Sequence, residues 1–196
     1  MGRTSDARER ILDAACGMIR DRGYSAVGVA EVCAAADVRK GSFYHYFESK
    51  QALTRTVIEG HWATERARWI ARLTGPGAPL DRLEALFAMQ ADDLRSEQAA
   101  GGAINGCLFA NLSLELSTRD PDIRADLEAV FDEQTTLVAD VLDEAVAAGE
   151  LVPETQVRDV AAALLAQLEG VVLFAKLRND TGSLDGLWDQ LRRLIA

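Results

Sequence analysis

Apolar residues recur every three or four positions along most of the chain, and this spacing predicts amphipathic helices. The first helix is expected over residues 5–22, because Ile11, Ala15 and Ile19 form one apolar stripe and the charged residues lie off it. Gly23 follows the last turn and is expected to end this helix. Alternating runs of Val, Ile, Thr and aromatic residues, which are typical of strands, are nearly absent. The pattern therefore predicts an all-α fold.

Two short helical segments are expected next, at residues 29–36 and 40–47, with a break between them at 37–39. Ser49 is expected to cap a longer helix from Lys50 to about Thr74. Further helical segments are expected at residues 80–97, 105–117, 121–148, 155–178 and 183–195. In the segment at 121–148, Asp120 is expected to be the N-cap and Pro121 to lie in the first turn. The prediction is about nine helices, divided into an N-terminal helix-turn-helix domain at 1–52 and a C-terminal helical ligand-binding and dimerisation domain at 53–196.

Composition and charge narrow the class of protein. The chain has 196 residues, 48% of them hydrophobic and 27% charged, which is the balance of a soluble globular protein and excludes overall disorder. The start carries no apolar leader, and the longest uncharged stretch is interrupted by glycine and asparagine, so neither export nor a membrane partner is expected. Three cysteines suit a reducing cytoplasm. The net charge is −10, but residues 1–50 sum to +1, so this part can bind DNA if its cations share one face.

The two short segments suit a helix-turn-helix. Val29, Val32 and Cys33 are expected to pack the first segment onto the opening helix, while Val38, Phe43 and Phe47 fix the second. This arrangement leaves a set of hydrogen-bond donors facing outward for phosphates and base edges, namely Arg39, Lys40, Ser42, Tyr44 and His45. Gly41 has no side chain, so a DNA strand can approach the backbone closely.

The same residues resemble the TetR/AcrR family of bacterial transcriptional repressors. The resemblance rests on Gly23-Tyr24, Val32 and the run Gly41-Ser42-Phe43-Tyr44-His45-Tyr46-Phe47-Glu48-Ser49-Lys50, and it covers roughly residues 5–55. It implies a regulator that binds a palindromic double-stranded operator as a homodimer and is released by a small-molecule effector or a reactive electrophile. It also implies that the second short helix enters the major groove and that Tyr44 and Lys50 bind phosphates. The expected DNA-binding residues are Gly28, Arg39, Lys40, Gly41, Ser42, Tyr44, His45, Tyr46 and Lys50.

Three positions depart from the family pattern. Val27 stands where a threonine usually caps the second helix, so that cap is expected to be lost. Asp37 replaces the usual turn glycine, and aspartate tolerates left-handed backbone better than most residues. Arg39 replaces a serine or threonine and adds a cation at the start of the recognition helix. For Tyr44 and Tyr46 the alternative to a DNA contact is ordinary aromatic packing.

The C-terminal body is expected to dimerise and to sense an effector. The resemblance places the dimer interface on the last two long helices, and its candidate residues are Leu164, Leu168, Val172, Leu184, Leu187, Trp188 and Leu191. An intramolecular core is the alternative for these apolar faces. Residues that could line an apolar pocket or sense the effector are Trp62, Trp69, Phe87, Cys107, Phe109, Phe131, Phe174 and Lys176.

Cys107 lies in a second, weaker resemblance, to a subgroup motif written Gly-Cys-Leu-x-x-Asn-x-x-x-Glu-Leu that occurs in regulators answering to electrophiles, organic acids or aldehydes. Asn105 is expected to be the N-cap here, which places Cys107 in the first turn, where the helix dipole stabilises a thiolate. Lys176 is expected either to reach solvent or to face an anion such as this thiolate or Glu115. An inert, packed thiol is the alternative.

A small cytosolic helical enzyme or an interaction module using Cys107 is the competing hypothesis for function. The two histidines, His45 and His61, form no catalytic triad pattern with a nucleophile, and the cysteines lack the spacing of metal ligands. No catalytic residue, metal site or cofactor is therefore expected.

Overall fold

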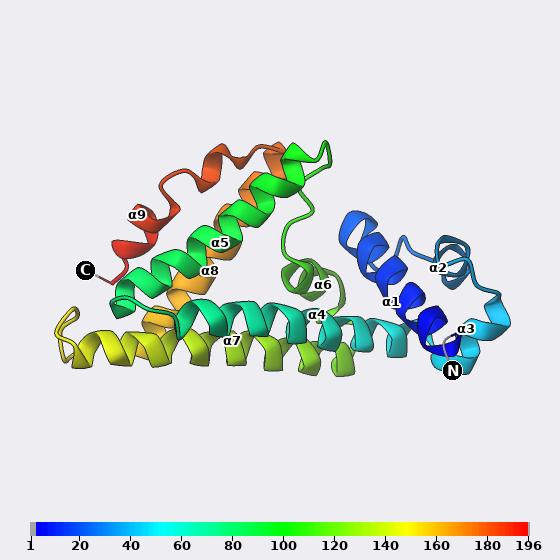
Figure 1. Ribbon diagram of the computed structural model, residues 1–196, viewed down its shortest axis with the longest axis horizontal. Coiled ribbons are helices and arrows are strands. Elements are labelled where there is room, and N and C mark those ends of the chain that lie inside the picture. Colours follow the sequence, from blue (N-terminus) through cyan, green and yellow to red (C-terminus); the bar gives the residue numbers. More distant parts are fainter. Residues whose placement is uncertain (1–2, 196) are drawn as a thin grey trace. The chain divides into compact units, whose positions relative to one another are not determined.

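The computed structural model describes residues 3–195 and is built of helices (Figure 1). The described residues form the α-helices α1 (Arg3–Arg22), α2 (Val29–Ala35), α3 (Lys40–Tyr46), α4 (Lys50–Leu73), α5 (Pro79–Ala99), α6 (Leu108–Leu116), α7 (Pro121–Ala147), α8 (Val157–Arg178) and α9 (Leu187–Arg192), and the 3₁₀ helix η1 (Thr181–Leu184). No strand occurs between residues 3 and 195. The prediction of an all-α fold is confirmed.

Local sequence signals place most of the helix ends. Gly23 has a left-handed φ of 81°, which ends α1 as expected. The hydroxyl of Ser49 accepts the amide hydrogen of Ala52 at 3.0 Å and so caps α4. The carboxylate of Asp120 accepts the amide hydrogens of Asp122 and Ile123 at 3.1 and 3.0 Å, which caps α7.

Several expected helices differ from the structure, and the first and fifth differ only by up to two residues at an end. The segment expected at 183–195 is divided into η1 and α9, because Gly186 adopts a left-handed φ of 67° between them. The helix expected at 105–117 begins only at Leu108, and the helix expected at 155–178 begins at Val157. Asn105 is not a helix cap: its backbone and side-chain nitrogens both donate to the carboxylate of Glu97, at 3.2 Å each, and Cys107 is the N-cap instead.

The contacts divide the chain into two compact units. Unit 1 holds the residues up to Ala63 together with Cys107–Ala129, and unit 2 holds Thr64–Gly106 and the residues from Val130 on. The boundary between these two units runs through α4 and α7. Unit 1 gains α6 because this helix packs against α1.

Each unit has its own apolar core. In unit 1 the side chains of Ile11, Phe43, Leu53 and Leu112 are fully buried, and Ile58 is nearly so. In unit 2, α5 packs against η1 and α9, and α8 packs against both of these as well. Its most deeply buried side chains include Leu83, Leu86, Phe87, Leu142, Leu164 and Leu191.

Among the described residues, α8 is the one helix long and apolar enough to cross a membrane by length and composition. Such a helix is also typical of the core of a soluble protein. The buried side chains of α8 pack within unit 2 and are Ala161, Leu164, Leu165, Leu168, Val171, Val172 and Ala175.

Candidate nucleic-acid interface

The helices α2 and α3 of unit 1 are joined by a tight turn. The amide of Val38 donates to the carbonyl of Cys33 at 2.9 Å, and the amide of Asp37 donates to the carbonyl of Ala34 at 3.2 Å. Asp37 has a φ of 51°, so this residue takes the left-handed conformation expected where the family pattern has glycine. The turn geometry of a helix-turn-helix is thus present with an aspartate.

Apolar side chains hold α3 in place. Phe43 is fully buried and Phe47 is 4% exposed, and their rings lie 5.8 Å apart. Val32 and Cys33 of α2 are buried, as predicted, while Val29 and Val38 are only half-buried. One face of α3 is therefore tied to the core, and its opposite face is free to meet a ligand.

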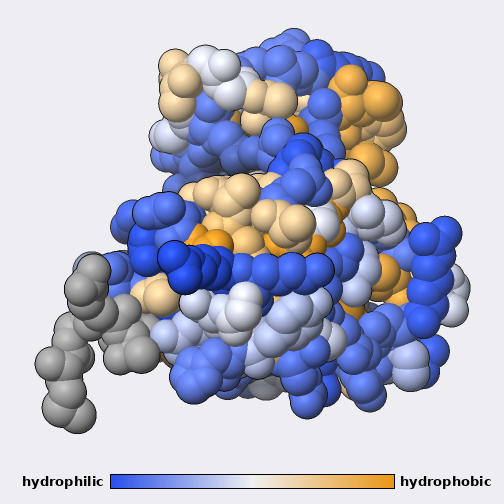
Figure 2. Space-filling view, turned by 90° about the vertical axis from the view of Figure 1, so that its right-hand side faces the viewer, coloured by the Kyte–Doolittle hydropathy of each residue, from blue (hydrophilic) through white to orange (hydrophobic). Residues whose placement is uncertain are grey.

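That opposite face carries hydrogen-bond donors. Arg39, Lys40, Tyr44 and His45 are all exposed, with Tyr44 53% exposed. Within the described part of the chain, the side chains of Arg39 and Lys40 make no hydrogen bond or ion pair, so their charges are available to an outside partner. Figure 2 shows a face of the molecule on which hydrophilic residues are mixed with apolar patches.

The remaining expected contact residues on α3 are less exposed. Ser42 and Tyr46 are half-buried, and the ring of Tyr46 meets that of His45 edge-on at 4.9 Å. Gly41 is exposed, and a Cβ added there would meet no atom within 4 Å. The fold itself therefore does not require glycine at this position, which fits a requirement imposed by a partner that approaches the backbone.

The start of α2 is held without a threonine cap. Gly28 is the N-cap, and its amide donates to the carboxylate of Glu31 at 2.8 Å, while Arg22 binds the same carboxylate at 3.1 Å. These bonds, the one from Gly28 first, lower the pKa of Glu31. Val27 is 2% exposed and belongs to the core. The expected loss of a cap at Val27 is thus offset by Glu31, three residues after the N-cap.

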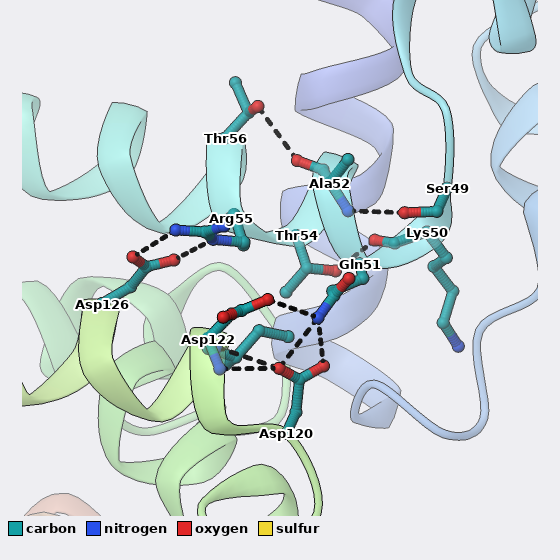
Figure 3. Close-up of polar contacts among 11 residues, drawn as sticks. Ser49, Lys50, Gln51, Ala52, Thr54, Arg55, Thr56, Asp120, Asp122 and Asp126 are labelled. Atoms are coloured by element: carbon teal, nitrogen blue, oxygen red, sulfur yellow. Dashed lines mark hydrogen bonds and ion pairs between the residues drawn. The ribbon is translucent and has the colours of Figure 1, made fainter.

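Lys50 lies differently from the other expected contact residues. Its ammonium donates to the carbonyls of Tyr24 and Val27, both at 2.8 Å, and sits 3.8 Å from the centre of the Tyr24 ring. In Figure 3 the side chain points away from the cluster around Asp120. Burial lowers the pKa of Lys50, and the nearby charge of Glu115 offsets part of this shift. In this structure the ammonium of Lys50 therefore binds the backbone of the loop before α2.

Polar contacts join the first turns of α4 to the start of α7 within unit 1 (Figure 3). The amide of Gln51 donates to both carboxylate oxygens of Asp120 at 2.9 Å, and Arg55 binds Asp126 through two bonds of 2.6 and 3.0 Å. Sequence reasoning identified Asp120 only as a cap. From the sequence, Glu115, which contacts the loop before α2, is expected only as part of the Cys107 motif and as one of the anions open to Lys176.

The expected pocket residues are divided between the units. In unit 1, Trp62 and Phe109 are buried with their rings edge-on at 6.2 Å, and Cys107 is half-buried. In unit 2, Trp69 and Phe87 are buried, and Phe87 stacks on Trp188 at 6.3 Å. The remaining three are in unit 2 and more exposed: Phe131 and Lys176 are half-buried, and Phe174 is 50% exposed.

The expected dimer residues lie mostly inside the single chain. Trp188 is half-buried, and the other six are buried within unit 2, namely Leu164, Leu168, Val172, Leu184, Leu187 and Leu191. The outward side of α8 instead carries Leu173, Phe174 and Leu177, each at least half exposed. Periodicity could not separate these faces, because α8 is apolar on nearly all sides.

No group of three or more His, Cys, Asp or Glu side chains among the described residues is placed to hold a metal ion. The cysteines Cys16, Cys33 and Cys107 are free thiols.

Comparison with known proteins agrees with this geometry. Residues 11–57 match the family described as bacterial regulatory proteins of the tetR family, and residues 79–191 match the tetracyclin repressor-like C-terminal domain. The chain is 38% identical over 173 residues to the transcriptional regulator AcuR of Cereibacter sphaeroides, covering 87% of this chain and 77% of that protein.

Solved structures match over nearly the whole length. A regulatory protein TetR from Rhodobacter sphaeroides superposes with a TM-score of 0.86 at 33% identity, covering 97% of this chain and 99% of that one. The reduced form of Escherichia coli NemR gives a TM-score of 0.86 at 30% identity, with 97% of each chain covered. The relatives are regulators and not enzymes, so the competing enzyme hypothesis is set aside. The chain belongs to the TetR family of bacterial transcriptional regulators.

Proposed function

We propose that the chain is a repressor that binds a palindromic operator through α3 and leaves it when an effector binds. The observation that carries the DNA contact is the exposed set Arg39, Lys40, Tyr44 and His45, of which the two cations have no partner within the described chain. An arginine or lysine can bind guanine in the major groove, and Tyr44 can donate to a phosphate. Phe43 and Phe47 hold the opposite face of α3, so this set is presented on a rigid support.

Mobility shift with the DNA upstream of the protein's own gene tests this contact. We expect Arg39→Ala and Lys40→Ala to relax sequence preference by about 1–3 kcal/mol where one of them makes a bidentate base contact. Tyr44→Phe removes a phosphate contact and should weaken binding to all sequences. Arg119→Ala, which removes an exposed arginine elsewhere in unit 1, is the control. Binding that responds equally to all of these changes would exclude α3 as the recognition helix.

A homodimer is the second part of the proposal. Two copies of α3 are needed to read two half-sites of a palindrome. The exposed side of α8 offers Leu173, Phe174 and Leu177, and the smaller residues Ala162, Ala166 and Gly170 continue the same helical stripe. Small residues followed by large apolar ones suit close packing against a second helix. We therefore assign the dimer contact to this outward side of α8, in place of the buried residues expected from the sequence.

Light scattering tests the dimer. Leu177→Glu places a charge on a side chain that is 73% exposed, so the monomer should still fold while the dimer dissociates. The matched control is Leu114→Glu, which changes a leucine 80% exposed on α6. A wild-type monomer at micromolar concentration, or equal effects of the two substitutions, would contradict the assignment. A charge at Leu168 or Leu187 is a poorer test, because both side chains are buried within the chain.

Release by an effector follows from a shift of population between two states of the dimer, which differ in the spacing of their DNA-binding domains. An effector that binds the wider-spaced state more tightly lowers operator affinity by the ratio of its affinities for the two states. The effector is a small molecule, or an electrophile that reacts with Cys107. One similar solved structure is described as the reduced form of Escherichia coli NemR, and we infer from this likeness that a thiol of this chain can respond to oxidation. The protein acts in the cytoplasm, where its DNA is found and where its three cysteines remain free.

A further inference from the structure

The carboxylate of Glu115, in α6, binds the loop that leads from α1 into α2. One oxygen accepts the amide hydrogen of Tyr24 at 2.7 Å, and the other accepts that of Ser25 at 2.6 Å. Both partners are backbone groups some ninety residues away in the sequence. Hydrogen bonds to a charged acceptor are stronger than neutral ones. This loop is therefore fixed by a helix that lies outside the helix-turn-helix sequence.

An ammonium group holds the other side of the same loop. Lys50, at the start of α4, donates to the carbonyls of Tyr24 and Val27 at 2.8 Å each. The amide of Tyr24 is thus bound by a carboxylate, and its carbonyl is bound by a cation. We call Glu115, Lys50 and the backbone of residues 24–27 the loop clamp.

The glycine next to the loop clamp allows the carboxylate of Glu115 to approach the backbone closely. Gly23 has a left-handed φ of 81°, and a Cβ added there would lie 3.2 Å from a carboxylate oxygen of Glu115. A side chain at this position would be strained by its own backbone and would also press on the carboxylate. Burial raises the pKa of Glu115, but the hydrogen bonds from Ser25 and Tyr24 and the charge of Lys50 outweigh it and leave the pKa below its ordinary value.

The loop clamp lies directly before the reading elements. Val27 is the last residue of the clamped loop, and the next residue, Gly28, is the N-cap of α2. α2 packs against α3, so a displacement of the loop is passed to the recognition helix. The carboxylate of Glu115 binds the amides of Tyr24 and Ser25, and its negative charge would repel a DNA phosphate.

We propose that Glu115 is a positioning residue for operator binding, acting through the loop clamp on α2 and α3 without touching DNA. The proposal rests on the DNA-binding role of α3 proposed above. It makes the state of α6 a determinant of operator affinity, because α6 supplies the carboxylate.

The direction in which a charge-neutralising substitution at Glu115 changes operator affinity tests the proposal. Removing a negative charge from a DNA-binding unit should by itself tighten DNA binding. Glu115→Gln keeps one acceptor oxygen but removes the charge and places an NH2 group against the amide of either Tyr24 or Ser25, so the loop clamp predicts roughly tenfold weaker operator binding. The control is Glu128→Gln, which removes an exposed carboxylate of α7 in the same unit and should leave binding unchanged or tighter. Glu115→Asp keeps the charge and should lose less affinity than Glu115→Gln.

Hydrogen exchange of the free protein supplies a readout that needs no DNA. In Glu115→Gln we expect faster exchange of the Tyr24 and Ser25 amides, with the circular dichroism and the exchange of unit 2 unchanged. Unchanged protection of these two amides would overturn the proposal, as would operator binding as tight as that of Glu128→Gln. The proposed function fails separately, if wild-type protein binds no upstream DNA or if Arg39→Ala and Lys40→Ala have no effect.

Discussion

Arg55 of α4 and Asp126 of α7 form a two-bonded ion pair, with nitrogen–oxygen distances of 2.6 and 3.0 Å. Asp126 lies six residues after the cap Asp120, which holds Gln51 one turn before Arg55 (Figure 3). The two contacts join the beginnings of two long helices within the unit that carries the helix-turn-helix. This geometry is bidentate, with two guanidinium nitrogens that each bind one carboxylate oxygen, which sets it apart from a single contact such as that of Arg124 and Glu128.

The Arg55–Asp126 pair is expected to stabilise unit 1 in a salt-dependent manner. Arg55→Ala and Asp126→Ala should each lower the urea midpoint, and the double variant should lose less than the sum of the two. Because the arginine is partly exposed, raising the salt concentration should shrink the coupling. The same cycle on Arg124 and Glu128, a single exposed contact of 3.6 Å, is the comparison. Equal coupling in the two cycles would show that the bidentate geometry adds nothing.

Asp37 stores backbone strain in the turn of the helix-turn-helix. At a φ of 51° an alanine should be less favourable than glycine by about 1 kcal/mol, because only glycine takes this conformation freely. We therefore expect Asp37→Ala to destabilise unit 1 relative to Asp37→Gly in urea unfolding. Both variants also lose the exposed 3.9 Å contact with Arg10, so their difference reports the backbone alone. Equal stability of the two would contradict the strain.

Val27 gives a prediction about the helix cap that the family pattern would supply. Its side chain is 2% exposed, and the start of α2 is already held by Glu31. Val27→Thr should therefore destabilise the protein by about 1–2 kcal/mol through the buried hydroxyl. Urea unfolding measures this directly. A stabilised variant would show that the missing threonine cap had left α2 short of a hydrogen bond.

Several helix ends were predictable because their signals are local. Gly23, Ser49 and Asp120 each act within a few residues of the helix that they end or begin. The break between η1 and α9 was missed, although Gly186 stands at it, because the apolar spacing of residues 184–195 continues across the break. A periodic pattern shows which residues share an apolar face, but it does not show whether the helix is continuous between them.

Contacts between distant residues were not predictable from spacing. Glu115 and Tyr24 are 91 positions apart, and no periodicity relates them. Lys50 was assigned to phosphate from the family resemblance, whereas here its ammonium binds two carbonyls of its own chain. The exposed residues of α3 were predictable because Phe43 and Phe47 fix which side of a short helix is buried.

The pH dependence of stability should report Glu115. Its pKa in the folded protein lies below the ordinary value of 4.5, so its stabilising contribution is complete above about pH 4.5 and is lost as the pH falls through the folded value. Wild type should therefore be more stable than Glu115→Gln at pH 6, and the difference between them should shrink as the pH falls below 4.5. Urea midpoints at several pH values test this. A difference that does not depend on pH would show that the carboxylate is not the stabilising form.

Cys107 is expected to react before the other two cysteines. It is the N-cap of α6, and its sulfur accepts the amide hydrogen of Ala110 at 3.5 Å, so a thiolate would face the positive end of the helix. Burial raises the pKa of Cys16 and of Cys33, which keeps both as unreactive thiols at neutral pH. Mass spectrometry after limited alkylation should find label at Cys107 first.

The replacement Cys107→Ser separates the thiol from the cap. Serine is a favoured N-cap residue, so this variant should keep α6, the position of Glu115 and normal operator binding. It should no longer be released from DNA by an electrophile or oxidant that releases wild type, since no nucleophilic sulfur remains at that position. Cys16→Ser, which changes a half-buried thiol within α1, is the control and should respond like wild type. A Cys107→Ser protein that still leaves DNA, or label appearing first at Cys16 or Cys33, would exclude the thiol as sensor and leave a noncovalent effector as the cause of release.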